Sequence, residues 1–270
     1  MLHTTTSTDG TKIAFDVIGD GPSLVVLGGA FNTRHSPHPL VDLLAERFTV
    51  YNPDRRGRGD SGNTLPYATR REVEDVEAVI RAAGGASALY GHSSGAILAL
   101  ETAAAVAAGA ASAADADGVT VTALAVYEPP YDVHADRAAT PDTSVQEALD
   151  AGDNDGAARA FLRITGMNDG AIEGMSGAPF WQGMISIAHT LAYDLALTGD
   201  GRVPVELLSA LSIPTLLLSG GASEAWAGAA IDLLAGTIPG SEKRTVAGQN
   251  HQVDQAVLAP ILAEFFGRAA

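Results

Sequence analysis

The sequence contains no cysteine. This absence excludes disulfide bonds, thiolate metal sites and cysteine nucleophiles. Basic side chains are also scarce, because 16 Lys and Arg stand against 32 Asp and Glu and give a formal net charge of -16. Contacts to phosphate groups need Lys and Arg in excess, so we expect neither a nucleic acid nor an anionic membrane surface as a partner.

Long hydrophobic runs are missing as well. The most apolar stretch, residues 94–116, is interrupted by Glu101 and Asp115, and it falls short of the ~18 apolar residues that a membrane-spanning helix needs. The chain begins Met-Leu-His-Thr, without the basic and apolar regions of a secretory signal. We therefore expect a cytoplasmic protein without a membrane-spanning segment.

Motifs for metals and dinucleotides are lacking too. The histidines have no H-E-x-x-H spacing, and Gly57-Arg58-Gly59 has no third glycine in register for a dinucleotide fingerprint. We expect no metal and no cofactor, which leaves a small-molecule substrate as the partner. We expect the protein to be a monomer or a homodimer.

The sequence does contain a regular alternation of strand and helix patterns. Short, nearly continuous apolar runs are typical of strands buried on both faces. They occur at residues 24–27, 48–51, 88–90, 124–127 and 215–218, with a more polar run at 243–246. Apolar residues at helical spacing lie between them, at residues 40–44, 73–80, 94–108 and 257–265. This alternation predicts an α/β fold with a mainly parallel sheet and helices on both faces.

Two segments depart from the alternation. Residues 3–18 alternate polar and apolar around Asp9-Gly10, which predicts an antiparallel hairpin with a type I′ turn at the sheet edge. Residues 129–212 separate the sixth and seventh predicted strands and carry helical patterns at residues 145–149, 157–164 and 185–197. We expect them to form a helical cap over the carboxyl end of the sheet, where open α/β sheets bind ligands. The predicted division is a core of residues 1–131 and 208–270 with a cap of residues 132–207.

Residues 91–95 read Gly-His-Ser-Ser-Gly between a predicted strand and a predicted helix. They match G-x-S-x-G in the strand, turn and helix context that gives this motif its meaning. The glycines let the backbone turn sharply, so that Ser93 Oγ is exposed above the sheet. The following helix aims backbone N–H groups and the positive end of its dipole at developing negative charge. Ser93 is therefore a candidate nucleophile.

Together with three other segments, this turn resembles the α/β-hydrolase superfamily over nearly the whole chain. The segments are LVVLGGA at residues 24–30, NPDRRGRGDS at residues 52–61 and AGQNH at residues 247–251. The resemblance implies that Ser93 is the nucleophile and His251 the base of a catalytic triad. Epoxide hydrolases and haloalkane dehalogenases of this superfamily carry Asp at the nucleophile position, so a serine disfavours both. The other members of the superfamily catalyse many different reactions, so the resemblance specifies the fold but not the substrate.

The resemblance also implies an oxyanion hole made of two backbone N–H groups. One belongs to Ser94, the residue after the candidate nucleophile. The other comes from the loop after the first parallel strand, where residues 28–31 match the family's His-Gly-X stretch with Gly28 in place of the histidine. By this match the second donor is the Ala30 N–H. We expect Asp54, Arg55 and Arg56 to hold the neighbouring loop in shape.

The acid of the triad is not at its usual position. Many members carry it as Gly-x-x-Asp after the strand that corresponds to residues 215–218, where this chain has Ser223. Some dehalogenases carry it at the end of the preceding strand, where this chain has Glu128 before two prolines. We therefore predict Glu128 as the acid, with Glu224 and Asp132 as the alternatives.

Four further side chains are candidates for substrate contact. Phe31 follows the expected oxyanion donor, and Trp181 and His189 lie in the predicted cap. His92, next to Ser93, is expected to pack or to form a hydrogen bond beneath the site. The leading hypothesis is a serine hydrolase that cleaves a small or medium ester, thioester or lactone. The alternatives are a lyase, cyclase or perhydrolase of the same fold, and a ligand-binding protein with a vestigial triad.

Overall fold

A computed structural model of the protein describes residues 2–36, 39–111, 118–133 and 142–269. Within them, eight strands form one sheet in the order β1-β2-β4-β3-β5-β6-β7-β8. The strands are β1 (Leu2–Thr6), β2 (Lys12–Ile18), β3 (Ser23–Leu27), β4 (Thr49–Pro53), β5 (Ala86–His92), β6 (Thr120–Tyr127), β7 (Thr215–Gly220) and β8 (Glu242–Val246). Neighbours from β4 to β8 run parallel, whereas β2 runs antiparallel to both β1 and β4. The predicted parallel sheet is confirmed.

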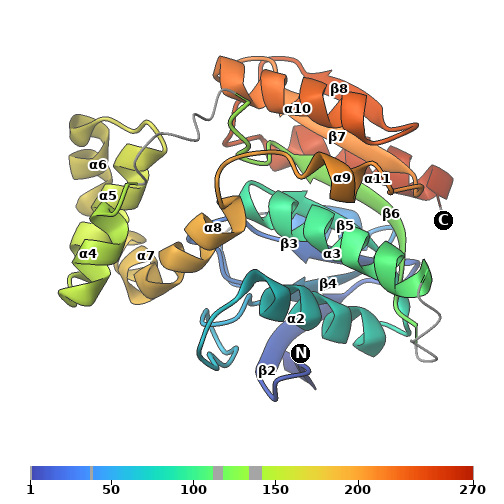
Figure 1. Ribbon diagram of the computed structural model, residues 1–270, viewed down its shortest axis with the longest axis horizontal. Coiled ribbons are helices and arrows are strands. Elements are labelled where there is room, and N and C mark those ends of the chain that lie inside the picture. The colour runs from blue at the N-terminus through green and yellow to red at the C-terminus, as the bar shows by residue number, and fades with distance from the viewer. Residues whose placement is uncertain (1, 37–38, 112–117, 134–141, 270) are drawn as a thin grey trace.

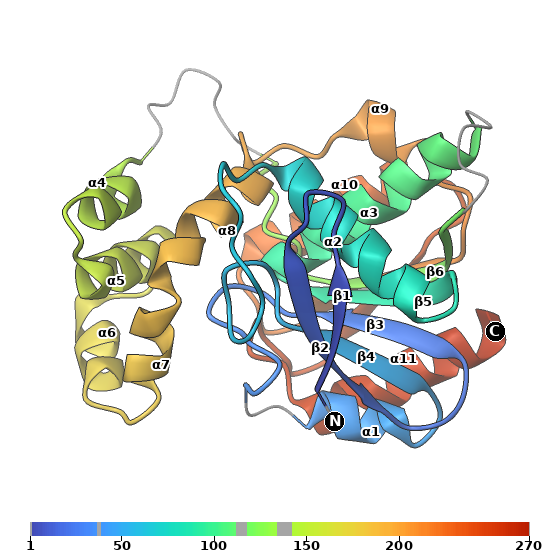
Figure 2. The same ribbon diagram turned by 90° about the horizontal axis from the view of Figure 1, so that it is seen from below.

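Helices cover both faces of the sheet (Figure 2). One face is covered by α2 (Thr69–Ala82), α3 (Ser94–Ala111) and α10 (Ala225–Thr237), and the other by α1 (Leu40–Ala45) and α11 (Gln255–Ala269). Successive strand residues point to opposite faces, so Val25 belongs to the first apolar core and Leu24 to the second. Burial on both faces explains the continuous apolar runs. No helix among the described residues has the length and apolarity that crossing a bilayer requires.

The hairpin of β1 and β2 lies at the sheet edge, as predicted, but its predicted type I′ turn is wrong. Gly10 N donates to Ser7 O at 2.9 Å, and Ser7 N donates to Thr11 O at 2.8 Å, so the loop has three residues. Gly10 has a φ of 85°, but Asp9 does not adopt the positive φ that a type I′ turn requires. Instead, the Asp9 carboxylate accepts a hydrogen bond from Thr11 N at 3.0 Å.

The described part of the segment between β6 and β7 is mainly helical, and most of its helices stand beside the sheet (Figure 1). Residues 134–141 of the predicted cap lie outside the described residues. The cap helices α4 to α7 pack around an apolar cluster of their own, and α8 contacts α2 and α3 of the core. The elements of the segment are α4 (Ser144–Asp150), α5 (Asn154–Ile164), α6 (Asp169–Ser176), α7 (Trp181–Ser186), η1 (Ala188–Thr190), α8 (Leu191–Thr198) and α9 (Val205–Leu208).

The single helix expected at residues 185–197 is interrupted. The structure instead has the end of α7, the 3₁₀ turn η1 and then α8. The interruption centres on Thr190, whose hydroxyl donates to Ile187 O at 2.8 Å and accepts from Arg58 Nε at 3.1 Å. A Thr hydroxyl that bonds to a nearby carbonyl competes with regular helical geometry. Here a contact with the core, 132 residues away in sequence, holds that side chain in place.

Candidate active site

Ser93 lies on a sharp, closely packed turn between β5 and α3. Its φ is 57°, a conformation that costs a non-glycine residue about 1–3 kcal/mol. A Cβ on Gly91 would lie 2.3 Å from Gly95 O, and one on Gly95 would lie 2.3 Å from Leu27 O. These positions therefore accept only glycine. Ser93 N also donates to Tyr127 O at 3.0 Å, which fixes the turn to the end of β6.

Three of the predicted residues meet at the carboxyl end of the sheet. His251, in the loop between β8 and α11, has Nε2 3.2 Å from Ser93 Oγ and Nδ1 2.7 Å from Glu128 Oε2. The Glu128 side chain is fully buried, and the His251 side chain is 34% exposed. A hydroxyl, an imidazole and a carboxylate in this order let the imidazole accept the Ser93 proton while the carboxylate orients the ring.

The carboxylate of Glu128 is held from three sides. Besides the bond from His251, its Oε1 accepts hydrogen bonds from Gly220 N at 2.7 Å and from Ser223 Oγ at 2.5 Å. Burial alone raises the pKa of Glu128, but these three hydrogen bonds outweigh it and hold the pKa below its usual value. The side chain is therefore a carboxylate at neutral pH. Glu224 and Asp132, the alternative acids, are both exposed.

The loop that follows β3 packs directly on the Ser93 turn. A Cβ on Gly29 would lie 2.8 Å from Ser93 Cβ and 3.1 Å from His92 O, so the close approach depends on the missing side chain. Phe31, two residues later, has a φ of 60°. Among the described residues, Phe31, Ser93 and Glu128 are the only non-glycine residues with a positive φ. Backbone strain thus concentrates around this site, as it does at many functional sites.

Comparison with known proteins identifies the family. A model of the alpha/beta hydrolase family matches residues 24–258. The chain belongs to this family. An alpha/beta hydrolase from Sphaerobacter thermophilus DSM 20745 has 43% identity and a TM-score of 0.87, with 98% of this chain and 100% of that chain covered. The resemblance stated from the sequence is therefore confirmed.

More distant solved structures share the fold of this alpha/beta hydrolase. The esterase RhEst1 from Rhodococcus sp. ECU1013 has 22% identity and a TM-score of 0.73, with 100% of this chain and 99% of that chain covered. A 2-hydroxy-6-oxo-6-phenylhexa-2,4-dienoate hydrolase from Rhodococcus sp. strain RHA1 has 18% identity and a TM-score of 0.67, with coverages of 99% and 100%. At these identities the similarity shows the fold alone.

The structure places the four candidate substrate-contact residues in different surroundings. His92 Nε2 donates to His251 O at 3.0 Å. Phe31 meets Phe161 of α5 edge-on, with ring centroids 5.5 Å apart, and so lies between the core and the cap. Trp181 is buried in the cap cluster, and its Nε1 donates to Asp155 Oδ1 at 2.7 Å.

His189 is half-buried in η1. Its pKa is lowered by burial and by the charge of Arg58, against a hydrogen bond with the Gly57 backbone that raises it. At neutral pH this favours a neutral imidazole. Contact of His189, Phe31, His92 or Trp181 with a substrate stays a prediction.

Sequence reasoning missed one aromatic side chain beside the site. Trp226, on α10, has its ring 5.8 Å from the ring of His251 and is half-buried. The signal was its position three residues after Ser223, at the strand end where the family usually carries its acid.

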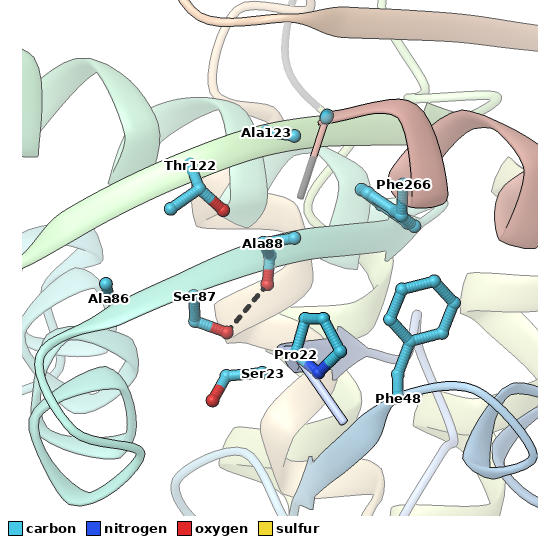
Figure 3. Close-up of a pocket in the computed structure, with 10 residues that line it drawn as sticks. Pro22, Ser23, Phe48, Ala86, Ser87, Ala88, Thr122, Ala123 and Phe266 are labelled. Carbon is cyan, nitrogen blue, oxygen red and sulfur yellow. Dashed lines mark hydrogen bonds between the residues drawn. The ribbon is translucent and has the colours of Figure 1, made fainter. Parts of the chain in front are cut away.

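The cavity shown in Figure 3 lies far from these residues in the fold. It has a volume of about 250 Å³ and is lined by residues that include Ser23, Phe48, Ala86, Thr122 and Phe266. Ser23 and Ala86 begin β3 and β5, whereas Ser93 and Glu128 follow the ends of β5 and β6. The cavity therefore lies at the amino end of the strands, opposite the carboxyl end that carries the triad.

Proposed function

We propose that this alpha/beta hydrolase is a serine hydrolase that cleaves a small or medium ester, thioester or lactone through an acyl-enzyme on Ser93. The observation that carries the proposal is the unbroken relay from Ser93 Oγ through His251 to the buried carboxylate of Glu128. A binding protein with a vestigial triad has no use for a strained serine and an ionised acid held in this order. The relay therefore favours catalysis over binding.

In the proposed reaction, His251 Nε2 takes the Ser93 proton while Ser93 Oγ attacks the acyl carbonyl. The backbone N–H groups of Ser94 and Ala30 stabilise the resulting oxyanion. The intermediate collapses as His251 returns the proton to the leaving alcohol or thiol, which leaves an acyl group on Ser93. A water molecule, deprotonated by His251, then attacks the acyl carbon and releases the acid, and Ser93 regains its proton. Glu128 stabilises the imidazolium in both halves.

The surroundings support an acyl group that is apolar. Ala30 and Phe31 pack against the apolar cluster of the cap, and the Trp226 ring lies 5.8 Å from the ring of His251. Apolar walls with a few convergent polar groups are typical of small-molecule sites.

The proposal is tested by incubating the protein with aryl esters, acyl thioesters and lactones of increasing acyl length, with the products identified by mass spectrometry. We expect release of a free acid from at least one class and loss of this activity in Ser93→Ala, with unchanged far-UV circular dichroism. A product formed without hydrolysis would instead favour the lyase, cyclase or perhydrolase alternative. Equal activity in the wild type and Ser93→Ala would contradict the proposal.

A further inference from the structure

Four charged side chains are buried beneath the candidate oxyanion loop. We call Arg55, Arg58, Glu72 and Asp194 the anchor cluster; each is at most 5% exposed. Asp194 accepts from Arg55 Nη1 at 2.8 Å, and both of its oxygens accept from Arg58 Nη2 at 2.8 Å. Arg55 Nε also donates to Glu72 Oε1 at 2.5 Å. Two cations and two anions leave the cluster neutral, which burial of charge requires.

The cluster holds one expected oxyanion donor through its own peptide group. Arg58 Nη1 donates to Gly29 O at 2.7 Å. Gly29 C=O and Ala30 N–H belong to the same planar peptide unit, so a fixed carbonyl also fixes the direction of the N–H. A cation bound to the carbonyl oxygen also polarises the unit and makes its N–H a stronger donor. Arg58 therefore acts on the Ala30 N–H from the far side of one peptide bond.

The same cluster holds the residue that carries the other expected donor. Ser94 Oγ donates to Asp194 Oδ1 at 2.7 Å and accepts from Arg55 Nη1 at 3.1 Å. Ser94 is 3% exposed and stands at the start of α3. Both segments that carry expected oxyanion donors are thus tied to a single carboxylate, that of Asp194.

Asp194 comes from the segment between β6 and β7, not from the core. It lies on α8, more than 130 residues from Arg58 in sequence. Burial alone raises the pKa of Asp194, but the charges of Arg58 and Arg55 outweigh it and hold the pKa below its usual value. An ionised Asp194 keeps the two arginine side chains together beneath the loop. The geometry of the oxyanion hole therefore depends on where α8 sits.

We propose that Arg58, Arg55 and Asp194 are positioning residues for the oxyanion hole, acting through the Gly29–Ala30 peptide and through the side chain of Ser94. The inference rests on the proposed function and extends it to a requirement that α8 be docked on the core. A side chain that acts in this way stabilises the transition state and leaves ground-state binding of the substrate nearly unchanged.

The test compares Arg58→Lys with Arg56→Lys. Lysine keeps the charge but loses the planar fork that reaches Gly29 and Asp194 together. Arg56 is a matched control, because it is 1% exposed, as Arg58 is, and donates to Asp75 at 2.6 and 2.7 Å and to Arg71 O at 3.0 Å. Arg56 Nη1 also donates to Asp9 Oδ2 at 3.1 Å. Its partners therefore lie on α2 and on the loop between β1 and β2, and not on the oxyanion loop.

We expect Arg58→Lys to lower kcat by at least roughly tenfold. The loss should stay below the 100- to 1,000-fold that is typical of removing an oxyanion donor outright. KM should change by no more than about twofold, since ground-state binding is spared. An aryl boronic acid, which forms a tetrahedral adduct on Ser93, should bind more weakly by the same factor as kcat falls. Arg56→Lys should change neither kcat nor boronate affinity.

A second variant covers the case in which Arg58→Lys does not fold. Ser94→Ala keeps the Ser94 N–H and removes only the hydroxyl that bonds to Asp194 and Arg55. It should lower kcat and boronate affinity together. The inference is overturned if the folded variants among these two keep wild-type kcat and boronate affinity, or if Arg56→Lys loses as much as they do. Failure of the proposed function looks different, because the wild-type protein itself would then neither hydrolyse the esters nor bind the boronate.

Discussion

Ser223 Oγ donates a 2.5 Å hydrogen bond to Glu128 Oε1, while Glu128 Oε2 accepts from His251 Nδ1 at 2.7 Å. Ser223 occupies the position at which many relatives carry the acid itself. In this chain the carboxylate beside His251 comes from the end of β6, and the loop after β7 supplies a hydroxyl that donates to it. The proposed reaction requires the carboxylate of Glu128, whereas the hydroxyl of Ser223 only supports that carboxylate.

Glu128→Gln should therefore lower kcat by about 10³- to 10⁴-fold, because an amide favours the wrong imidazole tautomer and leaves the imidazolium unpaired. Ser223→Ala should cost no more than about tenfold, since Gly220 N still donates to the carboxylate. Steady-state kinetics on the best aryl ester measure both effects. Equal and mild losses in the two variants would refute Glu128 as the acid.

The acid should also be movable. The Ser223 hydroxyl reaches the Glu128 carboxylate, so Ser223→Asp combined with Glu128→Ala should place a carboxylate in the space that Glu128 leaves. We expect the double variant to recover at least about tenfold of the activity lost in Glu128→Ala alone, because a carboxylate from either loop can orient the ring. The comparison needs only kcat/KM values for the two variants and the wild type. No recovery, in a folded double variant, would show that the β6 position is the only geometry the site accepts.

Glu128 should make the free energy of unfolding depend on pH. Its pKa is lowered in the folded state, so the unfolded chain binds the proton more readily. The stabilisation is present above the pKa of the unfolded state and is lost as the pH falls through the lower folded pKa. Urea unfolding between pH 7 and pH 3 should show Glu128→Gln losing less stability than the wild type over this range. The exposed Glu224→Gln serves as the control and should follow the wild type.

Gly95 should tolerate no side chain. A Cβ there would lie 2.3 Å from Leu27 O and 2.6 Å from Gly28 O, and both are backbone atoms that cannot rotate away. We expect Gly95→Ala to lower the free energy of unfolding by about 1–3 kcal/mol and to displace the oxyanion loop, with loss of activity. Gly183→Ala on α7 is the control, because a Cβ there meets nothing within 4 Å. Alanine should stabilise that helix position by roughly 0.5–1 kcal/mol. Thermal unfolding and ester turnover of both variants decide the point.

Much of the fold could be predicted because its signals are local. Strands buried on both faces are apolar at every position, as residues 24–27 and 215–218 show. The turn at Ser93 can be recognised from the sequence because only glycine fits at positions 91 and 95. His251 was found by its place after the last strand.

The features that sequence reasoning missed or left open depend on distant contacts. The choice among Glu128, Glu224 and Asp132 rests on loop geometry, including the positive φ of Glu128. Arg55 and Arg56 were expected to support a loop, but the role of Arg58 depends on Asp194 in α8. Similarly, the break in the helix predicted at residues 185–197 follows from the contact between Thr190 and Arg58.

The most direct test of the central claim is covalent labelling of Ser93. The wild-type protein and His251→Ala are incubated with an aryl alkylphosphonate ester, digested, and analysed by mass spectrometry for the peptide that contains Ser93. We expect one phosphonyl group per wild-type molecule, located on Ser93, and labelling slowed by at least about 10³-fold in His251→Ala. An unlabelled Ser93 in folded wild-type protein, or labelling that is equally fast without His251, would contradict it.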